Sequence, residues 1–110
     1  MFVNNPKKKR TSGFPSPAED FAEPSLDLNQ RLVPRPASTF LMRVSSVQYK
    51  HLGINKEDIL IIDRSLLPRP GKTIVAIVDG AMRLLLLGSH HRLNLQTDFW
   101  GVVTYVIRKL

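Results

Sequence analysis

Two stretches decide the fold of this chain: Gly53-Ile54-Asn55-Lys56-Glu57-Asp58-Ile59-Leu60-Ile61-Ile62-Asp63 and Ile74-Val75-Ala76-Ile77-Val78-Asp79-Gly80. Within the first, Ile59–Asp63 is a short continuous apolar run, which is typical of a strand covered on both faces. The second, with Thr73 in front of it, predicts another strand over Thr73–Val78. Asp79-Gly80 predicts a tight hairpin, because both turn positions need a positive φ.

The sequence on either side of these stretches continues the β pattern. Thr39–Val44 predicts a strand, Met82–Leu87 returns from the hairpin, and Gly101–Ile107 is rich in β-branched residues and predicts the last strand. Arg92–Leu95 is a candidate for one further short strand. Leu67–Gly71 predicts a turn from its prolines and glycine. We therefore expect a small, mainly β fold without internal repeats.

The N-terminal part of the chain reads differently. Residues 1–12 are polar and basic without periodicity, which predicts a disordered arm. Residues 13–20 include two prolines in three positions, so they predict an extended segment and no regular helix. We therefore expect two parts, a basic arm over residues 1–12 and a β domain over residues 13–110.

One short helix is expected at Asp27–Val33. Ser25 or Asp27 can cap its first turn, because both residue types accept hydrogen bonds from free backbone N–H groups. Pro34 stops it, because proline cannot continue a helix.

Composition excludes several classes of protein. The 110 residues include no cysteine, so a disulfide, a thiolate zinc site and a cysteine nucleophile are all excluded. No apolar run approaches the roughly 18 residues of a membrane span, and no apolar stretch follows the basic run Lys7–Arg10 as in a secretory signal. We therefore expect a cytoplasmic protein that does not engage a membrane. Adjacent His90 and His91 would point to opposite faces of a strand, so we expect neither a metal site nor a cofactor.

The net charge of +7 favours contact with nucleic acid or with an acidic partner surface. One interpretation is therefore a basic nucleic-acid-binding module in which residues 1–12 contact phosphates. The charge alone does not select this interpretation, because much of it lies in the arm and in scattered arginines.

Four blocks of the sequence carry a resemblance to a known family: Gly13–Asp20, Asp27–Gln30, Gly53–Gly80 and Gly101–Val103. In order, they resemble the segment after the self-cleavage bond, the following short helix, the core and the closing strand of the LexA/UmuD family of self-cleaving serine peptidases. They are more similar to UmuD-type members than to LexA. Family members have a longer stretch around Ser89–Asp98, so the resemblance implies a LexA/UmuD-like β fold with a shortened C-terminal half.

This resemblance implies a role in the SOS response to DNA damage. UmuD-type proteins are cleaved near the N-terminus when they meet the RecA filament, and the truncated dimer joins the catalytic subunit UmuC to form the translesion polymerase V. The implied function here is that of an accessory subunit of an error-prone polymerase. The implied partners are a UmuC-type polymerase subunit, the RecA filament and a second copy, with DNA contacted mostly indirectly. The implied cleavage junction is Ser12-Gly13.

The family chemistry needs a serine nucleophile and a lysine base. The resemblance carries the nucleophile position onto Gln48 and the base position onto Leu85. Glutamine has no hydroxyl, and leucine cannot accept a proton. We therefore expect that neither member of the dyad is intact and that self-cleavage is lost.

A working peptidase with an altered centre is the alternative. Ser45 and Ser46 lie near the nucleophile position, and in an extended segment Ser46 would be displaced by roughly 7 Å. Lys50 is close in sequence, and His51, His90 and His91 are further candidates for a base. Arg83 cannot serve, because arginine keeps its proton in proteins.

Overall fold

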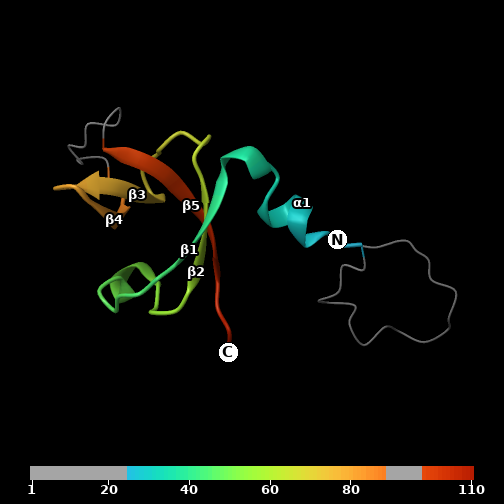
Figure 1. Ribbon diagram of the computed structural model, residues 1–110, viewed down its shortest axis with the longest axis horizontal. Coiled ribbons are helices and arrows are strands. Elements are labelled where there is room, and N and C mark those ends of the chain that lie inside the picture. The colour runs from blue at the N-terminus through green and yellow to red at the C-terminus, as the bar shows by residue number, and fades with distance from the viewer. Residues whose placement is uncertain (1–24, 89–97) are drawn as a thin grey trace, which may run out of the picture. The chain divides into compact units, whose positions relative to one another are not determined.

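The computed structural model describes residues 25–88 and 98–110. The predicted arm at 1–12, the extended segment at 13–20 and the candidate strand at Arg92–Leu95 lie outside the described residues. The elements in chain order are the helix α1 (Leu28–Leu32) and the strands β1 (Thr39–Arg43), β2 (Ile59–Asp63), β3 (Thr73–Val78), β4 (Ala81–Leu86) and β5 (Phe99–Ile107) (Figure 1). The prediction of a mainly β fold with one short α-helix is confirmed.

Helix α1 begins where the sequence supplies a cap. The side-chain Oδ1 of Asp27 accepts hydrogen bonds from the backbone N–H groups of Asn29, at 3.0 Å, and Gln30, at 3.3 Å. These bonds satisfy two of the N–H groups that the first helical turn leaves without a partner. Asp27 is therefore the cap, and Pro34 follows the end of the helix by two residues.

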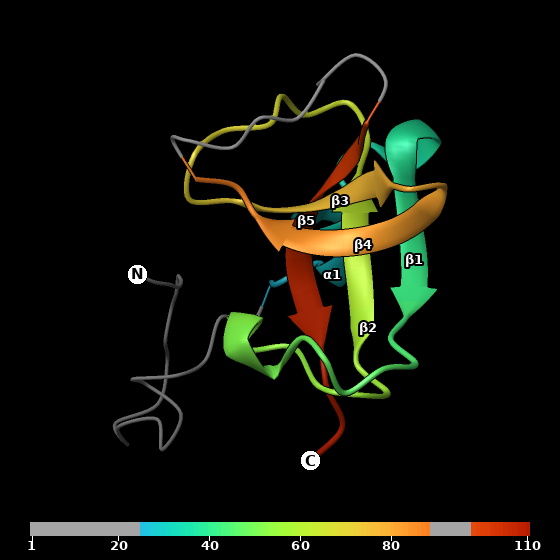
Figure 2. The same ribbon diagram turned by 90° about the vertical axis from the view of Figure 1, so that its left-hand side faces the viewer.

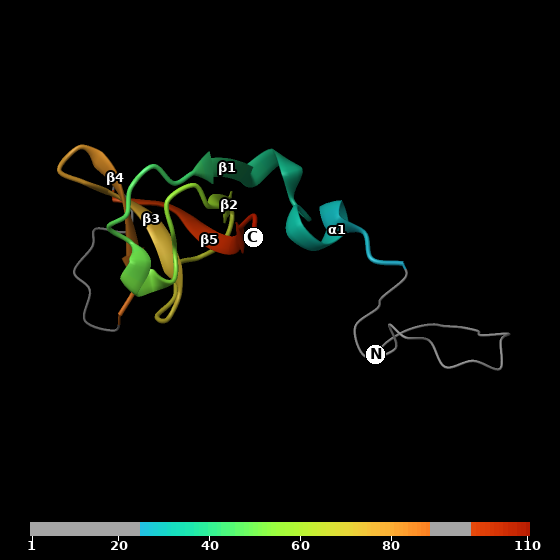
Figure 3. The same cartoon turned by 90° about the horizontal axis from the view of Figure 1, so that it is seen from below.

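All five strands belong to one antiparallel sheet in the order β1-β2-β5-β3-β4. Strand β5 is the centre of this sheet and has two neighbours. Its N-terminal part, Phe99–Val102, pairs with β3, and its C-terminal part, Val102–Ile107, pairs with β2. The β3–β4 hairpin therefore turns away from β1 and β2, and Figure 2 shows it running across their direction. Figure 3 shows the C-terminal end of β5 beside β2.

Two buried clusters hold the sheet together. The first has Val44, Ile54, Leu60, Ile62 and Val75 at its centre, with Met42, Tyr49, Leu52, Leu84, Trp100 and Val103 packed against it. The second has Ile74, Ala76, Leu87 and Val102 at its centre, with Leu66, Val78, Leu85 and Phe99 packed against it. Strand β3 contributes to both, because successive side chains of a strand point to opposite faces.

The hairpin between β3 and β4 forms at Asp79-Gly80, as predicted. Asp79 has φ 51° and Gly80 has φ 79°, so both turn residues are in the left-handed region that a two-residue hairpin of this type requires. Strand β4 begins at Ala81, one residue before the predicted start.

Strand β5 begins at Phe99, two residues before the predicted start at Gly101. Gly101 allows the close approach of β5 to β2. A Cβ atom at this position would lie 2.6 Å from Cγ2 of Ile62, which is closer than van der Waals contact permits. Glycine at this position thus marks tight packing between two strands and does not interrupt the strand.

Candidate functional site

The connection between β1 and β2 carries the position predicted for the nucleophile. Gln48 is exposed in a turn, and its backbone N–H donates to Oγ of Ser46 at 3.1 Å. A 3₁₀ helix at Lys50–Leu52 follows and ends at Gly53, whose φ is 77°. This short helix was not predicted. The hydroxyl of Ser46 therefore stabilises a local turn, and the side chain of Gln48 is exposed to solvent.

The position predicted for the base lies on β4 and points into the core. Leu85 pairs with Ile74 of β3 and is half-buried against the second cluster. Its neighbour Leu84 packs against the first cluster, as does Tyr49 from the connection between β1 and β2. Leu84 therefore packs in the same cluster as Tyr49 from the connection between β1 and β2, whereas Leu85 packs against the other cluster.

A pocket of about 220 Å³ lies between two parts of the chain. One part is β4, and the other is the end of β1 together with the residues that follow β1. Its lining consists of Met42, Arg43, Val44, Ser45, Tyr49, Leu60, Val75, Met82, Arg83 and Leu84. Ser45 supplies a hydroxyl, but this lining includes no lysine, histidine or carboxylate. The pocket therefore offers an apolar floor for binding, and its lining supplies neither the lysine of a serine–lysine dyad nor a histidine or carboxylate base.

Asp58 lies just before β2 and is buried, with a relative exposure of 2%. Its Oδ1 accepts a hydrogen bond from Nε of Arg108 at 2.8 Å, and its Oδ2 accepts one from Nη2 of the same guanidinium at 2.6 Å. The backbone N–H of Asn55 also donates to Oδ2, at 2.7 Å. The bonds from Arg108 lower the pKa of Asp58 to about 2, helped by Asn55, although burial acts in the opposite direction.

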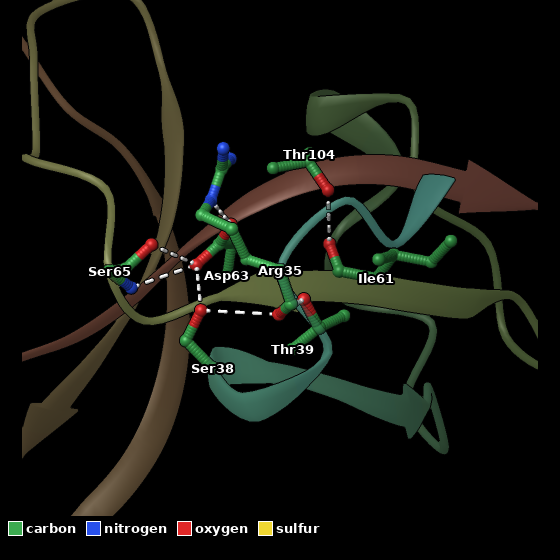
Figure 4. Close-up of polar contacts among 7 residues, drawn as sticks. All are labelled: Arg35, Ser38, Thr39, Ile61, Asp63, Ser65 and Thr104. Carbon is green, nitrogen blue, oxygen red and sulfur yellow. Dashed lines mark hydrogen bonds and ion pairs between the residues drawn. The ribbon is translucent and has the colours of Figure 1, made fainter. Parts of the chain in front are cut away.

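Asp63, the last residue of β2, is the second buried carboxylate (Figure 4). Its Oδ1 accepts hydrogen bonds from Oγ of Ser38 at 2.8 Å and from N and Oγ of Ser65 at 2.8 and 2.7 Å. Its Oδ2 accepts one from Nε of Arg35 at 2.7 Å. Burial alone would raise the pKa of Asp63, but the bonds from Ser65, Ser38 and Arg35 outweigh it and hold that pKa well below its ordinary range. Asp63 thereby ties the segment before β1 to the end of β2.

An aromatic contact closes one side of the first cluster. The guanidinium of Arg64 lies 4.3 Å from the ring centroid of Trp100, and Nε of Arg64 donates to the Trp100 carbonyl at 2.9 Å. Phe40 meets the same indole edge to face, with ring centroids 5.3 Å apart. These contacts cover a half-buried tryptophan, and we assign them a packing role.

The remaining predicted residues do not assemble into a site. Lys50 and His51 are exposed on the 3₁₀ helix, whereas the junction Ser12-Gly13 and the His90-His91 pair lie outside the described residues. Within residues 25–88 and 98–110, no three histidine or carboxylate side chains gather in a way that could hold a metal ion. None of the helices in these ranges has the length and apolar character of a membrane span.

Sequence reasoning missed the two buried carboxylates. A signal was present, since Asp58 and Asp63 stand on either side of the most apolar strand of the chain. Charged residues in such a place are rarely buried unless they are paired. The partner of Asp58 lies 50 residues away, however, and no local pattern indicates it.

The described residues form a small antiparallel β domain with a pocket between a hairpin strand and the segment that connects β1 to β2. Residues 7–89 match the family described as Peptidase S24-like, and the chain belongs to this family, the LexA/UmuD family. The resemblance found in the sequence is thereby confirmed at the level of the family. The matched range includes both Gln48 and Leu85.

Several known proteins are similar to this chain. Protein ImpA of Salmonella typhimurium is 36% identical in an alignment 113 positions long, which covers 89% of this chain and 78% of ImpA. Protein SamA of Salmonella typhimurium is 32% identical in an alignment 111 positions long, which covers 89% of this chain and 79% of SamA. Protein MucA of Escherichia coli is 31% identical in an alignment 112 positions long, which covers 86% of this chain and 77% of MucA.

Proposed function

We propose that this protein is a UmuD-like accessory subunit of an error-prone translesion DNA polymerase in the SOS response, and that it acts without self-cleavage. One observation carries the second part: the positions expected for the dyad hold an exposed glutamine, Gln48, and a half-buried leucine that packs against the second cluster, Leu85. Membership of the LexA/UmuD family supports the first part.

The chemistry of the dyad explains why these residues argue against cleavage. A serine hydroxyl must lie about 2.6–3.2 Å from its base, and a lysine base must be neutral near pH 7, which burial achieves. Leu85 has the apolar surroundings that would suit such a lysine but no amine. Ser45 contributes a hydroxyl to the pocket, but the pocket lining has no lysine, histidine or carboxylate to act as its base. A binding role needs neither group.

The partners follow from the same family membership. We propose that a UmuC-type polymerase subunit, the RecA filament and a second copy of the chain bind the β domain at residues 13–110. The basic arm, residues 1–12, would end at Ser12, so the junction Ser12-Gly13 would separate the arm from the β domain. DNA would be reached mainly through these partners, in the cytoplasm.

A cleavage assay tests the absence of self-cleavage. The protein is incubated with RecA filament, nucleotide and single-stranded DNA, and intact mass is followed over time at several dilutions. We expect no cleavage at Ser12-Gly13, while an active UmuD-type relative in a parallel tube is cut. Cleavage that persists at the same rate on dilution would show an intramolecular reaction and would refute inactivity. Cleavage only after the relative is added would make the chain a substrate.

The polymerase partnership is tested separately by co-expression with a UmuC-type subunit and affinity purification of one partner. We expect the complex to survive a rise in salt concentration, because the described surface offers apolar contacts. Binding to DNA alone that weakens steeply with salt and disappears when residues 1–12 are deleted would instead favour a basic nucleic-acid-binding module.

A peptidase with an altered centre is the second candidate, because Ser45 lines the pocket. If cleavage is detected, Ser45→Ala should abolish it. Ser46→Ala is the matched control, since the Ser46 hydroxyl accepts a bond from the backbone of Gln48 in a local turn. Cleavage that survives Ser45→Ala would rule out Ser45 as the nucleophile.

A further inference from the structure

We propose that Arg108 is a positioning residue that latches the pocket loop, residues 44–58, and thereby couples the C-terminal end of β5 to the shape of the pocket. Arg108 directly follows β5. It is absent from the pocket lining, so its influence on the pocket passes through the loop.

The guanidinium of Arg108 contacts the pocket loop at two places. It meets the carboxylate of Asp58 with two hydrogen bonds, of 2.8 and 2.6 Å, and its Nη2 also donates to the carbonyl of Gly53 at 2.9 Å. A planar guanidinium suits this forked contact, because its N–H groups are fixed in direction. One side chain thus fixes both the end of the loop and the turn in its middle.

Asp58 passes this constraint to the start of the loop. Its backbone carbonyl accepts a hydrogen bond from the N–H of Val44 at 2.8 Å, and the N–H of Glu57 donates to the carbonyl of Val44 at 2.7 Å. The N–H of Ile54 donates to the carbonyl of Tyr49 at 3.2 Å. The two ends of the loop are therefore joined beside the latch, and its middle is tied to Tyr49.

The loop supplies one wall of the pocket. Val44, Ser45 and Tyr49 line it, opposite Met82 and Leu84 of β4. A movement of the loop away from β4 would widen the pocket, because no described strand of the sheet pairs with β4 on that side. The position of Arg108 therefore sets the width of a pocket that it does not touch.

The latch is stronger than the other ion pair described on this loop. Arg43 and Glu57 lie 3.4 Å apart and are both exposed, so water screens their attraction. Asp58 is buried, and loss of Arg108 would leave its charge without an ion-pair partner, held by the backbone N–H of Asn55.

Single-cysteine labelling can test the latch, because the chain has no cysteine of its own. Val44→Cys places a thiol in the loop at a site that is 6% exposed, and Ala76→Cys places one in β3 at a buried site of the second cluster, outside the pocket lining. The rate of reaction with a chromogenic disulfide reagent then reports opening of the loop in the first protein and opening of the core in the second. Each is measured alone, with Arg108→Gln and with Lys109→Gln.

We expect Arg108→Gln to raise the labelling rate at position 44 at least tenfold more than the rate at position 76. Equal increases at both positions would mean that Arg108 contributes only to global stability, and this result would overturn the proposal. So would an unchanged rate at position 44. Lys109→Gln removes the same charge one residue further on, and we expect it to change neither rate. An increase equal to that of Arg108→Gln would show an effect of net charge and would refute the latch.

Two further measurements keep the test decisive. Arg108→Lys retains the charge without the fork, and we expect a labelling rate between those of the unchanged protein and Arg108→Gln; full protection would overturn the role of the forked contact. If the cysteine proteins fold poorly, hydrogen exchange on the cysteine-free chain replaces labelling. Arg108→Gln should then speed exchange at residues 45–53 more than in β3, and equal acceleration would refute the proposal.

Discussion

The pocket loop and strand β4 line the same pocket, but they are held in place by opposite means. The loop exposes Gln48 and is fixed by backbone bonds and by the charged contact between Asp58 and Arg108. Strand β4 is fixed by Leu84 and Leu85, which pack into the two apolar clusters. Of the two positions expected for the dyad, Gln48 therefore exposes its side chain to solvent, whereas Leu85 packs against a buried cluster.

The largest expected effect is at the core position. Leu85→Lys would place a charged amine against Ile74, Ala76 and Val102, where desolvation disfavours the charged form. We expect the free energy of unfolding to fall by about 1–3 kcal/mol, because the half-buried side chain loses apolar contacts and gains a charge. Urea unfolding followed by the fluorescence of Trp100 measures this change.

The adjacent residue provides the control. Leu86 lies on the same strand but is 51% exposed, and we expect Leu86→Lys to change the free energy of unfolding by no more than about 0.5 kcal/mol. Equal losses in the two variants would contradict the assignment of Leu85 to the core. They would also remove the contrast between the two dyad positions.

An intermediate effect is expected from pH at the charged contact of the pocket loop. The pKa of Asp58 is lowered to about 2 in the folded protein, from an ordinary value near 4. Its ionised form therefore stabilises the fold above pH 4 or so, and this contribution is lost as the pH falls from about 4 to about 2. We expect the Tm of the unchanged protein to fall steeply over this range.

Asp58→Asn separates this carboxylate from the others. The variant should have a lower Tm at pH 6 and a shallower fall between pH 4 and pH 2. Some dependence should remain, because the pKa of Asp63 is also depressed. Parallel curves for the two proteins would show that Asp58 does not couple pH to stability.

The strands were predictable because their signals are local. The apolar run at Ile59–Asp63 and the hairpin residues Asp79-Gly80 define β2 and the β3–β4 turn without reference to the rest of the chain. The start of β5 was misplaced because Gly101 looks like a boundary in the sequence, whereas in the structure it admits Ile62 at close range. The 3₁₀ helix at Lys50–Leu52 was missed because a single turn has no periodicity to detect.

The site was predictable only in part, for a related reason. The resemblance indicates which positions to examine, Gln48 and Leu85, and the residue types there already argue against the dyad chemistry. It does not indicate that Leu84 and Leu85 face different clusters, which follows from the pairing of β4 with β3. It also gives no sign of the contact between Arg108 and Asp58, because that contact depends on where β5 ends relative to a loop 50 residues earlier.

The smallest expected effect is at the exposed position. Gln48→Ser should change the free energy of unfolding by less than about 0.5 kcal/mol, because the side chain is exposed and its backbone bond to Ser46 does not depend on it. Mass spectrometry should detect no cleavage at Ser12-Gly13, alone or with Leu85→Lys, since a lysine in the second cluster would not face the pocket loop. Cleavage by the double variant would place both positions at one active centre. The inactivity of the unchanged protein would then come from the residue types at positions 48 and 85 alone, on a scaffold that still supports the reaction.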